Sequence, residues 1–312
     1  MALIFIAGLA FTYMGSNEFY FFAAFAILQA LIMATAWNIL GGFTGYVNFG
    51  SAGFFALGAY TSIAMNKAMD GPPLILMMLV AATLGGLTGW GTGYLTLRLR
   101  GVYFAIATLA MAIVLETFVT NWTYVGGARG AYIIVTGDPP LFGSYIEYLF
   151  MVMLVLAIGS VAVARYINHS WIGRGLASIR DDETAAECNG VPTLRLKLIS
   201  TTVMGAMMAL AGAPYPFFVG YVDPPSAFSL LVAVNSIAMP MIGGTATWLG
   251  PVIGSLLLGT VQQVITVTVS GVLNLLIVGV LLVVFVTLAP EGIVGLVQKL
   301  RHRARERRRA VA

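Results

Sequence analysis

The chain has very few of the residues that build disulfides and metal sites. It contains one cysteine, Cys188, and two histidines, His169 and His302. A single thiol excludes an internal disulfide. Both histidines fall in polar segments, which excludes a histidine metal site within the membrane, and we expect no metal ion in this chain.

Charged residues are also scarce. They make up 9% of the 312 residues, whereas 59% are hydrophobic, and a soluble domain has about 25% charged residues. A water-soluble fold of this size cannot hide so much apolar surface, so the solvent of this chain must be the lipid bilayer. Apolar runs of about 20 residues fit helices that cross about 30 Å of hydrocarbon.

The hydropathy pattern predicts an all-α polytopic membrane protein with about ten transmembrane helices. The predicted spans cover residues 1–14, 19–41, 50–66, 73–96, 101–121, 144–165, 196–219, 228–243, 249–268 and 272–289. Both termini are placed in the cytoplasm, because fourteen of the sixteen Lys and Arg residues then lie inside and only Lys67 and Arg129 lie outside. The chain is thus one transmembrane domain, 1–312, with a cytoplasmic loop at 166–197 and a basic cytoplasmic tail at 298–312.

Glycines are dense between Trp37 and Tyr60, in the segment WNILGGFTGYVNFGSAGFFALGAY. Each glycine costs a helix about 1 kcal/mol relative to alanine, so we expect a broken or re-entrant stretch around residues 42–49. Irregular backbone at membrane depth survives where it is buried in protein or lines a watery cavity, and there it can offer polar groups to a solute. Close helix packing through small residues is the alternative, and both can hold.

A similar but weaker glycine pattern occurs later in the sequence, with Gly243-Gly244-Thr245 and then Gly250, Gly254 and Gly259. An internal repeat, which is common in transporters, would explain the similarity of the two segments. Chance among 36 glycines explains it as well.

Polar groups in or beside the spans are candidates for a solute pathway. Glu116 is the one acidic residue placed well inside a span, and ionisable groups within the membrane suggest function. The candidate pathway residues are Asn38, Gly42, Thr44, Gly45, Asn48, Ser51, Glu116 and Asn235. We predict no catalytic residue among them.

The long polar interruption at 165–197 predicts two short amphipathic helices on the cytoplasmic side. Asp181 or Asp182 can cap the second helix, which would run to Cys188 and end at Asn189-Gly190. We interpret the acidic residues as a solvated helix face rather than a metal cluster, because no histidine or thiol set accompanies them. Small apolar side chains, those of Ala177, Ala185 and Ala186, leave room for a partner surface.

Four segments, taken in order, resemble one family: NILGGFTGYVNFGSAGFFALGAY, LRLRGVYFAIATLAM, GRGLASIRDDETAAECNGV and IGGTATWLGPVIGSLLLG. They are similar to the permease subunits of branched-chain amino-acid ABC importers, in the LivM-type branch. The resemblance implies a permease of the bacterial inner membrane that imports branched-chain or other hydrophobic amino acids. It also implies three kinds of partner: a second related permease, two ATPase subunits and an extracytoplasmic solute-binding protein.

The resemblance further implies that segment 174–191 carries the helix that couples to the ATPases. The candidate coupling residues are Arg174, Ile179, Arg180, Asp181, Asp182, Glu183, Ala185, Ala186, Glu187 and Gly190. The chain lacks the Walker A pattern G-x-x-x-x-G-K-S/T. We therefore expect no cofactor and no enzymatic activity in this chain, with ATP and magnesium bound by the partner ATPases, and no nucleic-acid partner.

Three alternatives remain open. In the first, the chain is a permease of the same architecture that imports urea, short amides or another small polar solute, as the family resemblance also implies. An ion-coupled secondary transporter would place Glu116 on an ion path. A polytopic membrane enzyme would need clustered His, Asp, Glu or Cys near an interface, and the acidic cluster at 181–187 has no nucleophile or base arranged around it.

Overall fold

The computed structural model describes residues 18–69, 71–96, 98–133 and 144–268, together with positions 276, 279, 280, 283, 287 and 292–296. The predicted span 1–14, the basic tail 298–312 and most of the predicted span 272–289 lie outside the described residues. The helices in chain order are α2 (Glu18–Thr44), α3 (Ser51–Met69), α4 (Leu74–Thr96), α5 (Val102–Asn121), α6 (Tyr145–His169), α7 (Trp171–Asp181), α8 (Glu183–Cys188), α9 (Thr193–Gly212), α10 (Tyr215–Val219), α11 (Pro224–Ala227), α12 (Leu230–Gly243) and α13 (Leu249–Thr268). The short elements are two 3-10 turns, η1 (Thr123–Val125) and η2 (Gly127–Arg129), and two strands, β1 (Ala131–Tyr132) and β2 (Tyr221–Val222).

Eight of the ten predicted spans fall largely within the described ranges, and each corresponds to a helix or a near-continuous helix pair. Among the described residues, seven helical stretches are long and apolar enough to cross a membrane. The eighth, α3, is rich in Gly, Ala, Ser and Thr and is buried along most of its length. The all-α polytopic architecture is confirmed, while the total of about ten spans and the location of the termini stay predictions.

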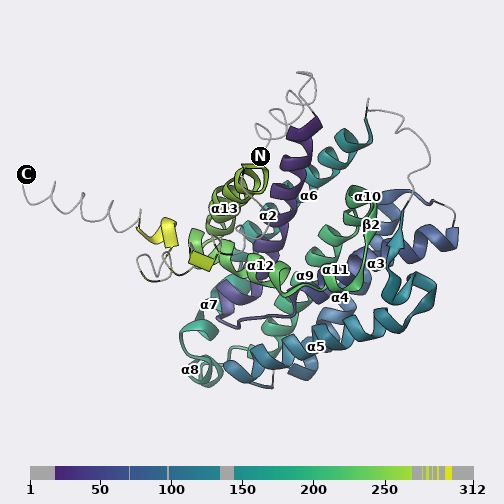
Figure 1. Ribbon diagram of the computed structural model, residues 1–312. Coiled ribbons are helices and arrows are strands. Elements are labelled where there is room, and N and C mark those ends of the chain that lie inside the picture. The colour runs from purple at the N-terminus through teal and green to yellow at the C-terminus, as the bar shows by residue number, and fades with distance from the viewer. Residues whose placement is uncertain are drawn as a thin grey trace, which may run out of the picture.

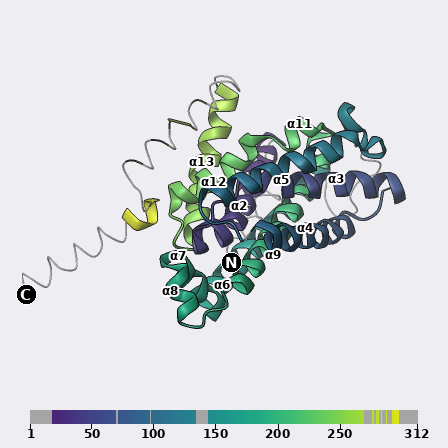
Figure 2. The same ribbon diagram turned by 90° about the horizontal axis from the view of Figure 1, so that it is seen from below.

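Two helices, α2 and α9, form the centre of the bundle. Figure 1 shows α6 on one side of α2 and α13 on the other, and α12 also contacts α2. On the far side, α9 packs against α3 and α4, and Figure 2 shows α4 and α9 side by side. Pro214 caps the start of α10 just after α9 ends, Pro216 lies in the first turn of α10, and Pro240 lies inside α12, which continues through it.

Small residues explain how closely α4 and α9 approach. Gly85, Gly89 and Gly93 recur every fourth residue and therefore share one face of α4. A Cβ atom added at Gly85 would lie 2.5 Å from the carbonyl oxygen of Gly205, and one added at Gly89 would lie 2.5 Å from that of Thr201. The two backbones can meet only because these side chains are absent, as is common between membrane helices.

One end of the bundle gathers segments that are predicted to face the cytoplasm. The loop between α4 and α5 brings Arg100 to within 3.6 Å of Glu183 on α8. At the end of α6, the guanidinium group of Arg165 lies over the ring of Trp248, 5.3 Å from its centre. These segments are distant in sequence, so their meeting agrees with the predicted sidedness.

The loops that are predicted to lie outside also contact one another. Lys67, at the end of α3, donates a hydrogen bond of 3.0 Å to the carbonyl oxygen of Tyr124. β1 and β2 pair antiparallel, with Ala131 opposite Val222 and Tyr132 opposite Tyr221. Which end faces the cytoplasm remains a prediction from the distribution of Lys and Arg.

Candidate functional site

The glycine-rich break lies slightly later than predicted. α2 continues through Gly41 and Gly42 to Thr44, and the non-helical backbone covers 45–50 rather than 42–49. Gly42 is needed for close approach rather than for a turn, because a Cβ atom there would lie 2.6 Å from the carbonyl oxygen of Thr245. Gly45 begins the turn with a φ of 78°, in the left-handed region that suits glycine.

The break is re-entrant, since the chain folds back along α2 and α5 before α3 begins. Trp37 Nε1 donates to the carbonyl oxygen of Asn48 at 2.8 Å, and Trp37 is seven residues, about 10 Å, before the end of α2. The amide of Phe49 donates to Thr108 Oγ1 at 3.2 Å, well inside α5. α3 therefore starts inside the bundle, beside the last turns of α2.

Several predicted pathway residues hold this break in place. Asn48 Oδ1 accepts a 2.6 Å hydrogen bond from the amide of Gly50, at the start of α3. Thr44 Oγ1 donates to the carbonyl oxygen of Leu40 at 2.5 Å. Both side chains are buried, and the structure gives them roles in the turn itself.

The two glycine-rich breaks touch each other. Asn38 Nδ2 on α2 donates to the carbonyl oxygen of Thr247, between α12 and α13, at 3.4 Å. Asn38 Oδ1 is buried and has no hydrogen-bond partner among the described residues. The breaks differ in packing, because α12 and α13 contact each other extensively through glycines, whereas α2 and α3 diverge.

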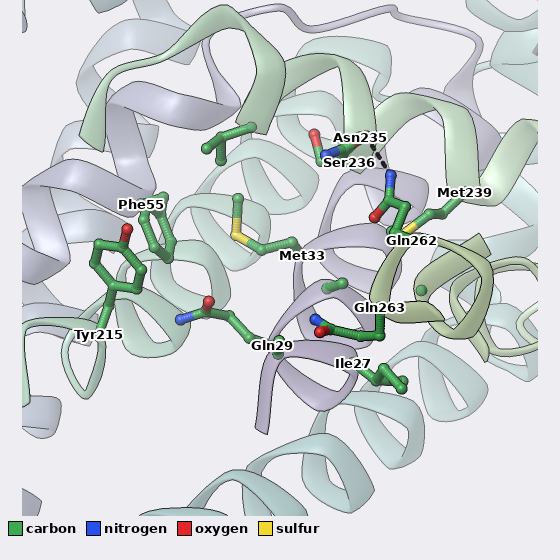
Figure 3. A pocket seen from close by; sticks show the side chains of 14 residues that line it. Ile27, Gln29, Met33, Phe55, Tyr215, Asn235, Ser236, Met239, Gln262 and Gln263 are labelled. Atoms are coloured by element: carbon green, nitrogen blue, oxygen red, sulfur yellow. Dashed lines mark hydrogen bonds between the residues drawn. The ribbon is translucent and has the colours of Figure 1, made fainter. Parts of the chain in front are cut away.

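A cavity of about 190 Å³ lies between α2, α3, α10, α12 and α13. The described residues that line it are Ala26, Ile27, Gln29, Ala30, Met33, Phe55, Tyr215, Val232, Asn235, Ser236, Met239, Gly259, Gln262 and Gln263. Figure 3 shows Gln29 and Tyr215 on one side and Asn235, Gln262 and Gln263 on the other, with Met33 between them. None of these side chains is charged.

The cavity contains only one of the predicted pathway residues, Asn235, whose Oδ1 accepts a 3.1 Å hydrogen bond from Gln262 Nε2. Ser51 is connected to its wall, because Ser51 Oγ lies 2.8 Å from Oγ of Ser236. Glu116 lies elsewhere, half-buried on α5, and makes no hydrogen bond or ion pair with another described residue. The glutamines were missed, although amide side chains within apolar spans were a readable signal.

A buried polar cluster occupies the end of the bundle where α7 and α8 lie. Lys197, with 3% of its side chain exposed, places Nζ 2.6 Å from Glu183 Oε1. Tyr46 donates its hydroxyl to Glu183 Oε2 at 2.5 Å and accepts from Lys197 Nζ at 3.2 Å. Arg100 adds a second positive charge, 3.6 Å from the same carboxylate. We call Tyr46, Arg100, Glu183 and Lys197 the inner-end cluster.

Charge and hydrogen bonding set the ionisation of this cluster. Burial alone would raise the pKa of Glu183, but hydrogen bonds from Lys197 and Tyr46 and the charges of Lys197 and Arg100 outweigh burial and lower the pKa. Burial, followed by the hydrogen bond to Glu183, raises the pKa of Tyr46. Glu183 is therefore an anion and Tyr46 a neutral donor at physiological pH.

An open groove of about 590 Å³ lies beside the cluster. Its walls combine the turn after α2, the start of α5 and the junction of α7 with α8, and they include Thr44, Gly45, Ile179, Arg180 and Glu183. Arg180 Nη1 also donates to the carbonyl oxygen of Gly42 at 3.4 Å. The structure thus brings predicted pathway residues next to predicted coupling residues.

The predicted helix caps of the polar segment are confirmed. Asp182 Oδ1 accepts a 3.0 Å hydrogen bond from the amide of Ala185 at the start of α8, and Gly190, with a φ of 80°, follows its end. Of the predicted coupling residues, those exposed on this surface are Arg174, Arg180, Asp181, Asp182, Ala185, Glu187 and Gly190.

Two interpretations of this segment were wrong. Glu183 does not belong to a solvated face, because its carboxylate is paired with Lys197 and only 12% of its side chain is exposed. Ala186 offers no surface to a partner, because it is buried against the core, as Ile179 is. Lys197 was overlooked, although an ionisable residue at the start of a predicted span requires a partner.

Comparisons with known proteins agree on one family. A family model described as "Branched-chain amino acid transport system / permease component" matches residues 19–286. The high-affinity branched-chain amino acid transport system permease protein LivM of Escherichia coli is 25% identical over 290 aligned positions, which cover 84% of this chain and 67% of that protein. LivM of Salmonella typhimurium is 26% identical over 320 positions, covering 94% and 73%.

The similarity extends to a second permease of the same kind of system. The LivH permease protein of Salmonella typhimurium is 22% identical over 283 positions, which cover 85% of this chain and 90% of that protein. No solved structure matches the chain.

Proposed function

Because this chain belongs to the family of branched-chain amino acid transport permeases, we propose that it is a permease subunit of an ATP-driven importer for branched-chain or other hydrophobic amino acids. In this proposal it forms the translocation path together with a second, related permease. Relatives named LivM and LivH are different permease proteins of branched-chain amino acid transport systems, and both resemble this chain. That double resemblance supports a heteromeric pair.

The observation that carries the coupling part of the proposal is the inner-end cluster. Through Glu183, it ties the first turn of α8 to the base of α9, to the α4–α5 loop and to the turn after α2. A push on the exposed face of α8 would therefore reach α2, α5 and α9 together. We propose that separate ATPase subunits dock on α7 and α8 and that their ATP-driven closure moves these helices.

The permease needs two conformations with different accessibility rather than a catalytic group. In the proposed cycle, an extracytoplasmic binding protein delivers the solute at the end of the bundle that carries β1 and β2. ATP and magnesium belong to the partner chains. Branched-chain amino acids are the proposed solutes because the relatives are named for them.

The test is purification of this chain from its native membrane in mild detergent, followed by reconstitution into vesicles. We expect two ATPase chains and a second permease to copurify, and leucine uptake to require ATP and the binding protein. Recovery of the chain alone, with uptake that survives ATP depletion while an ion gradient is held, would contradict the proposal and favour a secondary transporter. Uptake of urea or a short amide in place of leucine would keep the importer and change its solute.

A further inference from the structure

The cavity between α2, α3, α10, α12 and α13 is lined by polar and apolar side chains. It has room for far more than one water molecule, which needs about 15 Å³. Six polar side chains from four helices line it: Gln29, Tyr215, Asn235, Ser236, Gln262 and Gln263. Met33 and Phe55 add apolar surface on the same cavity (Figure 3).

The hydrogen-bonding capacity of these side chains is only partly used. Asn235 and Gln262 share one amide–amide hydrogen bond, so in either orientation the pair keeps one NH2 group and one carbonyl oxygen. Gln29 Nε2 donates to the carbonyl oxygen of Ala211 at 3.2 Å, which leaves Gln29 Oε1 available. Among the described residues, neither the amide of Gln263 nor the hydroxyl of Tyr215 has a hydrogen-bond partner.

Packing alone does not account for this arrangement. Amide groups between membrane helices normally bond to each other or to backbone, because an unpaired group in an apolar surrounding is costly. Here, among the described residues, acceptors and donors remain unused around one cavity. They match the needs of an ammonium group, which only donates, and of a carboxylate, which only accepts.

We propose that this cavity is a solute-binding site that holds an α-amino acid with an uncharged side chain, its ammonium and carboxylate groups bound by the amides and its side chain packed on Met33 and Phe55. The inference rests on the proposed function and adds the residues that would contact the solute. Because no described lining residue is charged, a basic or acidic side chain would enter the cavity without a counter-charge from these residues and be disfavoured.

The single native cysteine makes a direct test possible. In a Cys188→Ser background, Gln263→Cys is introduced and the complete transporter is reconstituted in vesicles. A small water-soluble methanethiosulfonate reagent should modify Cys at 263, and saturating leucine should slow the reaction about tenfold, whereas arginine should not. The matched control is Leu256→Cys on the same helix, whose side chain is exposed on the outside of the described bundle and should stay unreactive in lipid.

A second measurement keeps the inference testable if the thiol variant fails to assemble. Gln263→Met and Asn235→Leu should each lower maximal leucine uptake about tenfold by removing a hydrogen bond to a charged group. The leucine concentration for half-maximal uptake should stay unchanged, because the binding protein sets it. Unprotected or absent labelling at 263, or normal uptake by both variants, overturns the binding site. If the unaltered complex shows no ATP-driven leucine uptake, the proposed function fails instead.

Discussion

Lys197 Nζ lies 2.6 Å from Glu183 Oε1, and the pair joins the base of α9 to the first turn of α8. Both side chains are largely removed from solvent, and Tyr46 bonds to each of them. A buried ion pair of this kind is weak evidence for stability, but removing one partner is costly, because the remaining buried charge is left without its partner.

Removing the cation alone should therefore destabilise the protein more than removing both charges. Lys197→Met is expected to destabilise the complex by about 3 kcal/mol, the low end for a broken buried pair because Arg100 remains beside Glu183. The double variant Lys197→Met/Glu183→Gln should recover most of the loss, because no buried charge is left unpaired. Thermal unfolding of the detergent-solubilised complex measures both. Equal losses in the single and double variants would show that the ion pair does not position α8.

Acid should weaken the inner-end cluster only below the ordinary carboxyl range. The pKa of Glu183 is lowered from 4.5 in the folded protein, so its ionised form contributes stability that is fully present above 4.5 and is lost as the pH falls through the lower folded-state value. The measurement is the thermal midpoint from pH 7 to pH 3, compared with that of Glu183→Gln. The difference between the two proteins should be constant above pH 5 and shrink below about pH 4.5. A difference that shrinks already between pH 7 and pH 5 would contradict this assignment.

Bulk on the exposed face of α8 should uncouple transport. Ala185 is exposed and Ala186 is buried on the same helix. Ala185→Trp is expected to reduce ATP-driven uptake about tenfold or more by obstructing the docked partner, while the protein still reaches the membrane and keeps its thermal midpoint. Ala186→Trp should instead lower the thermal midpoint, because it overpacks the core. Normal uptake by Ala185→Trp would remove this face from the coupling role.

Two glycines on α4 offer a matched test of helix packing. Gly89→Ala places a Cβ atom 2.5 Å from the carbonyl oxygen of Thr201, and Gly91→Ala meets no atom within 4 Å. The first should cost about 1–3 kcal/mol by overpacking, and the second should be neutral or stabilise by up to about 1 kcal/mol through helix propensity. The thermal midpoints of the two variants measure this difference in stability. Equal midpoints would show that α4 and α9 can move apart without loss of stability.

Local signals in the sequence predicted the elements well. Asp182 and Gly190 have side-chain and backbone preferences that act within a few residues, so the start and end of α8 could be predicted. The dense glycines predicted a break, and its position shifted because helical hydrogen bonding continues through Gly41 and Gly42 in a protein-lined environment.

The sites depend on contacts between distant segments, which a local pattern does not contain. Tyr46 and Glu183 are 137 residues apart, and the cavity combines α2 with α12 and α13. Polar residues within apolar runs still indicated where partners were required. Asn235 was identified in this way, and the same reasoning applied to Gln29, Gln262 and Lys197 would have identified more of both sites.

The short ladder between β1 and β2 acts as a clasp at the end of the bundle opposite α8. Its backbone hydrogen bonds, including the one from the amide of Ile133 to the carbonyl oxygen of Gly220 at 2.9 Å, bind the segment after α5 to the turn after α10. A rigid-body motion that pulled these two segments apart would first have to break these backbone hydrogen bonds.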